Sequence, residues 1–139
     1  MQLITDRTDG DVLLGTEKGR YNYTDLNRVE NAVAQLLQFG EPLGLKQNLI
    51  IKTDWGLPGS FNADEWPTAA QMQRYLSNVR TLRDAVSLES ALPETMEHLT
   101  WQGANAIEQV LSDVHLRMNA ILNTLQYSGE IFAGEELYL

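Results

Sequence analysis

The chain has 139 residues, a formal net charge of −9 and no cysteine. This length corresponds to one ordinary domain, and a hydrophobic content of 43% is enough to form a core. The chain has 19 acidic residues and only 10 basic ones, so phosphate backbones and anionic membrane surfaces are poor partners for this protein. The absence of cysteine excludes disulfides, thiolate catalysis and Cys-based metal sites.

Targeting and membrane segments are not expected. The first ten residues lack the apolar run of a signal peptide, and no stretch of the chain approaches 18 apolar residues. We therefore expect a soluble protein that folds in the cytoplasm, with no nucleic-acid partner and no membrane partner.

Residues 1–23 are expected to form an extended arm. Two short apolar stretches, at 2–5 and 12–14, flank the polar run at 6–11, and Gly15 and Gly19 mark turns. This pattern fits two short strands or an extended segment bound to a partner.

A first helix is predicted over residues 25–39. Thr24 suits its N-cap, and Gly40 followed by Pro42 suits its end. Its apolar stripe consists of Leu26, Val29, Val33, Leu36 and Leu37.

The region 40–66 is the least regular part of the chain. Residues 48–52 fit either a short buried strand or part of a helix, and glycine and proline mark a loop from residue 55. Trp55, Phe61 and Trp66 crowd this loop. Exposed rings would face a ligand such as a sugar or a partner pocket; alternatively, the rings fold the loop back as a lid over the helical core.

A second helix is predicted after Pro67 and ends near Ser87. Thr68 with Gln71 three residues later forms a capping-box pattern. The second helix carries its apolar stripe at Met72, Leu76, Val79, Leu82 and Val86. A short helical turn is predicted over residues 94–98, after Pro93.

A third, long helix is predicted from the N-cap Thr100 to about Gln126. Apolar residues alternate spacings of three and four over three heptads, at Ala104, Ile107, Leu111, Val114, Met118, Ile121 and Leu125. At 1.5 Å per residue this helix spans roughly 40 Å, more than a small domain needs, so part of it is expected to project or to pair with another subunit. The apolar tail at 127–139 is expected to dock as a strand or on a neighbouring subunit.

Asn27 with Glu30, and Asn105 with Glu108, repeat one pattern near the starts of the first and third helices. Residues three apart share a helix face. The carboxylates could meet in the bundle at a metal site, or both helices could use the same device to hydrogen-bond a neighbouring loop or helix end. A di-metal site requires Glu-x-x-His, which neither helix has, so the second interpretation is favoured.

Motifs for catalysis are missing. His98 and His115 fit a solvated helix face and the flank of the packing seam, and Ser60 lacks the second glycine of a nucleophile elbow. Neither glycine-rich phosphate-binding motif occurs. We therefore expect no enzyme activity, no cofactor and no metal site.

Several polar segments, which helix periodicity does not explain, carry a resemblance. They lie at 21–33 (YNYTDLNRVENAV), 52–55 (KTDW), 67–72 (PT and QM), 75–80 (YLSNVR), 99–108 (LTW, AN and IE) and 127–135 (YSGE and GE). In this order they resemble small structural proteins encoded among tail and baseplate genes of phages and prophages of gut Firmicutes. The resemblance implies a virion component that is assembled in the bacterial cytoplasm from identical copies and has no enzyme activity.

Together these patterns predict a mainly α fold, a three-helix bundle-like single domain with an extended arm at 1–23, a helical core at 24–126, a docking tail at 127–139 and short terminal β-strands. The predicted function is that of a structural subunit of a phage tail tip, baseplate or fibre attachment, binding itself as a homo-oligomer and other virion tail proteins. The alternative is a glycan- or receptor-binding module that uses Trp55, Phe61 and Trp66. The predicted interface consists of Leu111, Val114, Met118, Ile121, Leu125, Ile131, Phe132 and Tyr138.

Overall fold

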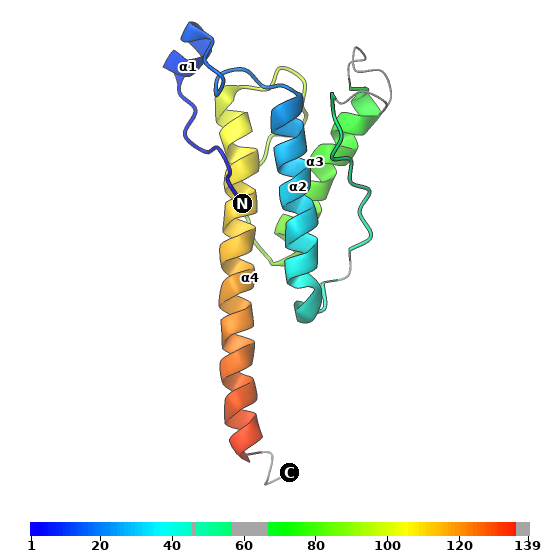
Figure 1. The fold of residues 1–139 in the computed structure, drawn as a ribbon, viewed down its shortest axis with the longest axis vertical. Coiled ribbons are helices and arrows are strands. Elements are labelled where there is room, and N and C mark those ends of the chain that lie inside the picture. Colours follow the sequence, from blue (N-terminus) through cyan, green and yellow to red (C-terminus); the bar gives the residue numbers. More distant parts are fainter. Residues whose placement is uncertain (46, 57–66, 136–139) are drawn as a thin grey trace.

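The computed structural model describes residues 1–45, 47–56 and 67–135, with side chains up to residue 125. Within these ranges the elements follow in the order α1 (Asp9–Leu14), α2 (Tyr23–Gly40), the 3-10 turn η1 (Glu41–Leu43), α3 (Ala69–Ala85) and α4 (Trp101–Glu135). Helices α2 and α3 pack against the first half of α4, and α4 continues past them (Figure 1). The mainly helical, bundle-like fold is confirmed.

The predicted terminal β-strands are wrong for the described residues, which contain no strand. Residues 12–14 lie in α1, because Thr8 and Asp11 form a reciprocal capping box and Gly15 ends the helix in the left-handed conformation. Residues 127–135 continue α4 as a helix. No proline interrupts this stretch, and its two glycines, Gly129 and Gly134, cost only about 1 kcal/mol each relative to alanine.

The start of α2 lies two residues before the predicted one. Asn22, rather than Thr24, is the N-cap: its side chain accepts from the Thr24 backbone N–H at 2.9 Å. The Asp25 carboxylate accepts in return from the Asn22 backbone N–H at 2.8 Å. The helix then runs to Gly40, one residue past the predicted end.

The capping box at the start of α3 is confirmed. The Thr68 hydroxyl accepts from the Gln71 backbone N–H at 3.1 Å, and the Gln71 side chain accepts from the Thr68 backbone N–H at 2.8 Å. The predicted helical turn at 94–98 is wrong, since only a turn occurs there and His98 has a positive φ of 52°. A positive φ is incompatible with a continuing right-handed helix.

The N-cap of α4 is as predicted, because the Thr100 hydroxyl accepts from the Gly103 backbone N–H at 3.0 Å. The apolar stripe of α4 divides at Met118. Ala104 is buried beside the N-terminal region, and the stripe from Ile107 to Met118 is buried in the core with α2 and α3. Ile121 is half-buried, and Leu125 is 51% exposed. The stripe therefore serves the chain's own core as far as Met118, and at Ile121 and Leu125 the described residues cover it only in part.

Candidate functional site

Two matching arrangements of side chains organise the polar interior, and we name them the Asn-x-x-Glu clasps. In the clasp on α4, Asn105 binds both backbone groups of Arg7: it accepts from the N–H at 3.1 Å and donates to the carbonyl at 3.0 Å. Glu108 accepts from the backbone N–H of Ile4 at 3.0 Å. This clasp fixes the N-terminal arm on α4, about 100 residues away along the chain.

The clasp on α2 repeats this geometry. Asn27 accepts from the backbone N–H of Trp55 at 2.8 Å and donates to its carbonyl at 2.9 Å. Glu30 accepts from the backbone N–H of Lys52 at 3.1 Å. Both bound segments have the sequence x-Thr-Asp-x, at 4–7 and 52–55. The interpretation that both helices use one device to bind a neighbouring segment is confirmed.

The carboxylate of Glu108 lies in a buried network of two arginines and two acids. Arg7 donates to it at 2.7 Å, and Arg28 donates to both of its oxygens at 2.6 and 2.8 Å. Asp25 accepts from Arg7 at 3.1 Å and from Arg28 at 2.5 Å. Hydrogen bonds from Arg28 to Glu108 and then to Asp25 raise the pKa of the guanidinium above its usual value. Since the side chain of Glu108 is fully buried, this pairing compensates its loss of hydration.

Glu30 is held by a second set of donors. Arg74 donates to its two oxygens at 2.6 and 3.0 Å, and the indole N–H of Trp55 donates to one of them. Arg74 and Asn78 also donate to the carbonyl of Ile50, at 2.6 and 2.8 Å. Both clasp carboxylates are thus bound by arginine. This pairing supports the interpretation that they hydrogen-bond neighbouring segments over the interpretation that they bind a metal.

Trp55 is therefore a core residue rather than a ligand-facing one. Its side chain is 2% exposed, and its ring packs in the hydrophobic cluster formed by α2, α3 and α4. For this ring the structure agrees with the alternative in which the loop folds back over the core. Phe61 and Trp66 lie outside the described residues.

Tyr21 and Tyr75 share a hydrogen bond between their hydroxyl groups. Burial raises the pKa of both phenols above the ordinary value near 10. In the unfolded chain both lose a proton near pH 10, whereas the folded chain keeps both protons to higher pH. The folded state therefore binds more protons in this range, and its stability falls as the pH rises.

We expect the free energy of unfolding to fall from about pH 10 upward, and to fall less steeply in Tyr75→Phe than in the wild type. Urea unfolding followed by circular dichroism at pH 8, 9, 10 and 11 measures this. Tyr23→Phe, which removes a phenol at a half-exposed position, is the control with which Tyr75→Phe is compared. Equal slopes in the wild type and in Tyr75→Phe would contradict the prediction.

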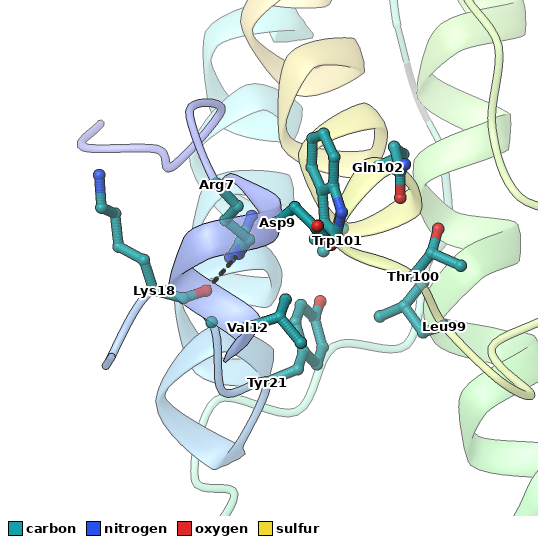
Figure 2. Close-up of a pocket in the computed structure, with 11 residues that line it drawn as sticks. Arg7, Asp9, Val12, Lys18, Tyr21, Leu99, Thr100, Trp101 and Gln102 are labelled. Atoms are coloured by element: carbon teal, nitrogen blue, oxygen red, sulfur yellow. Dashed lines mark hydrogen bonds between the residues drawn. The ribbon is translucent and has the colours of Figure 1, made fainter. Parts of the chain in front are cut away.

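A pocket of about 460 Å³ lies between the N-terminal region and the first turn of α4. Figure 2 shows Trp101 of α4 beside Val12 and Tyr21, with Arg7 donating to the Lys18 carbonyl at 3.0 Å. The lining contains a single carboxylate, that of Asp9, and holds neither histidine nor serine. The lining therefore lacks the pairing of serine with histidine that is common in nucleophilic catalysis.

Apolar side chains are exposed at both ends of the molecule, on α1 and at Leu125 of α4. The α1 tip consists of Val12, Leu13 and Leu14, and its two leucines are 80% and 82% exposed. The α4 overhang comprises residues 119–135, which follow the buried Met118 and lead away from the bundle (Figure 1). Sequence reasoning anticipated the overhang from its heptad pattern and missed the α1 tip, although Thr8, Asp11 and Gly15 signal a short capped helix.

The predicted interface residues fall into three groups. Leu111, Val114 and Met118 are fully buried in the chain's own core. Ile121 and Leu125 lie on the overhang with partial exposure. The side chains of Ile131 and Phe132, on the last turns of α4, and the whole of Tyr138 lie outside the described part.

No helix in the described part of the chain combines the length and apolarity needed to cross a membrane. Comparisons with protein families, with curated proteins and with solved structures found no match to this chain.

Proposed function

We propose that this protein is a non-catalytic structural subunit of a phage tail tip, baseplate or fibre attachment that assembles with copies of itself and with neighbouring virion proteins. The observation that carries the proposal is the α4 overhang. Helix α4 has 35 residues and α2 has 18, so they span about 52 Å and 27 Å. The apolar stripe continues on α4 past the point where its intrachain partners end.

A projecting helix of this kind gains stability from a partner. Most helical stability in proteins comes from packing an apolar face, so a helix end that continues past its intrachain partners is stabilised when its stripe is covered. Burying the exposed half of Leu125 contributes about 1 kcal/mol, and copies that pair would bury further apolar groups of the stripe at once.

The use of the buried polar groups also supports a structural role. Glu30 and Glu108 are each bound by arginine and by backbone N–H groups, and they fix segments distant in sequence. The placement in a virion rests on the resemblance of the polar segments to phage tail and baseplate proteins.

We expect the untagged protein to form a defined oligomer, measured by light scattering on a size-exclusion column across a hundredfold concentration range. Leu125→Asp should shift it to monomer, because the new charge would be buried at the interface, and the monomer should keep the wild-type helix content in circular dichroism. Thr124→Asp is the control, since Thr124 is exposed one position away and off the apolar stripe.

A wild-type monomer at every concentration would refute assembly through the overhang, as would an unchanged oligomer in Leu125→Asp. The virion assignment has its own test, in which mass spectrometry searches for peptides of this chain in purified phage particles. Their absence from particles would refute that assignment.

A further inference from the structure

The pocket between the N-terminal region and α4 has walls that hydrogen bonds hold in place. Arg7 donates to the carbonyl of Lys18 at 3.0 Å, which joins the N-terminal arm to the loop after α1. The Thr100 hydroxyl accepts from the Gly103 backbone N–H at 3.0 Å and caps the first turn of α4, where Trp101 lies. The walls are therefore ordered before a ligand arrives, which lowers the entropic cost of binding.

One wall of the pocket is an aromatic ring outside the hydrophobic core. Trp101 is half-buried, whereas Trp55 is 2% exposed and donates to Glu30. The ring of Trp101 lies beside Val12 and Tyr21 (Figure 2). Within the described part of the chain its indole N–H has no hydrogen-bond partner. An accessible ring with a free donor suits a ligand that has both an apolar face and polar edges.

Two polar side chains complement this ring. The Asp9 carboxylate and the Gln102 amide both line the pocket, and neither has a hydrogen-bond partner among the described residues. The carboxylate accepts, while the amide both donates and accepts, so together they match the mixed donor and acceptor character of hydroxyl groups. A pyranose sugar combines such hydroxyl groups with a face of C–H groups that packs on an aromatic ring.

The charges around the pocket favour a neutral ligand. The Arg7 guanidinium is buried and already paired with the carboxylates of the ionic network, and Lys18 pairs with Asp6 at 3.1 Å. An anionic ligand would meet the carboxylate of Asp9, and a cationic ligand would meet the ammonium of Lys18.

We propose that this pocket binds a neutral pyranose sugar, with the sugar ring stacked on Trp101 and its hydroxyl groups bound by Asp9 and Gln102. The volume of about 460 Å³ lies within the range of small-molecule sites, about 300–1,000 Å³. This inference goes beyond the proposed function and does not depend on assembly, because one chain supplies every wall. It assigns sugar binding to Trp101, whereas Trp55 is buried in the core.

Nuclear magnetic resonance of the ¹⁵N-labelled protein tests the site. The probes are the methyl glycosides of glucose, galactose, mannose and N-acetylglucosamine, added up to about 10 mM so that weak binding is detected. At least one probe should shift the indole N–H signal of Trp101, which is identified by its absence from Trp101→Phe, and leave that of Trp55 unchanged. The uronate and the amino sugar with the same ring configuration should bind about tenfold more weakly, because each meets a like charge.

Four variants locate the binding. Trp101→Ala should abolish it, and Asp9→Asn and Gln102→Ala should each weaken it about tenfold, the effect of one lost hydrogen bond. Glu17→Gln is the control, since it removes an exposed acid near α1 that does not line the pocket and should bind as the wild type does. Circular dichroism checks that each variant is folded. Because Asp9 and Gln102 are exposed, their variants keep the test valid even if Trp101→Ala unfolds.

Three results would overturn the inference. The first is the absence of a shift with every neutral sugar, and the second is binding that survives both Trp101→Ala and Asp9→Asn. The third is a shift caused only by N-acetyltyrosinamide, a probe for the side chain of a partner protein, which would assign the pocket to a protein instead of a sugar. These results leave the proposed function untouched, because light scattering tests assembly independently of the pocket.

Discussion

Replacing Glu108 with glutamine is expected to lower the free energy of unfolding by about 3–5 kcal/mol, the range found when one partner of a buried ion pair is removed. Glu108 is fully buried and accepts from Arg7 and Arg28. After the substitution, one carboxylate, that of Asp25, faces two guanidinium groups. Glutamine keeps the shape of the side chain and can still accept from the backbone N–H of Ile4. The loss in the free energy of unfolding therefore reports the removed negative charge.

Urea unfolding at pH 7 measures this change, and Glu97→Gln is the matched control. Glu97 is exposed, so the control should stay within about 0.5 kcal/mol of the wild type. Adding Arg7→Met to Glu108→Gln should recover part of the loss, because the substitution removes the uncompensated cation. A loss below about 1 kcal/mol in Glu108→Gln would show that Asp25 alone balances both arginines, and would contradict the prediction.

Helix periodicity and capping patterns predicted the main helices because both are local in sequence. The Thr68 and Gln71 capping box and the Thr100 cap need no knowledge of distant residues, and both occur as predicted. Helix α1 was not predicted, although its pattern, Thr8 with Asp11 and then Gly15, is equally local. The apolar residues 12–14 were instead interpreted as part of a short strand or an extended segment. The end of α4 was misplaced because no proline or cap marks it.

The ionic network could not be predicted from periodicity, since its members come from three separate segments. Arg7 lies about 100 residues from Glu108 and 18 from Asp25, and no local pattern specifies that they meet. Two signals were nevertheless present in the sequence. Glu30 and Glu108 sit next to apolar stripe residues, and the two x-Thr-Asp-x segments mirror the two Asn-x-x-Glu pairs, so pairing the repeats would have predicted both clasps.

The second large effect is expected for Trp55→Ala, a loss of about 3–5 kcal/mol in the free energy of unfolding, the range for truncating a buried aromatic side chain. The ring of Trp55 is 2% exposed and stacks under the Lys52 ammonium at 5.2 Å, and its indole N–H donates to Glu30. Removing it leaves a cavity next to a buried carboxylate. Trp101→Ala, at the half-exposed wall of the pocket, should cost clearly less.

Trp55→Phe separates the two contributions of this side chain. Phenylalanine keeps most of the apolar area but cannot donate to Glu30, so its loss should lie near 1–3 kcal/mol, between the wild type and Trp55→Ala. This series also tests the glycan-binding alternative for Trp55. A ring that stacked on a sugar would be dispensable for folding, so a Trp55→Ala protein with wild-type stability and no binding to cell-wall glycans would favour that alternative. A destabilised Trp55→Ala protein would show that Trp55 stabilises the fold. Burial of its ring and the hydrogen bond from its indole N–H to Glu30 would then both hold the segment 52–55 on α2.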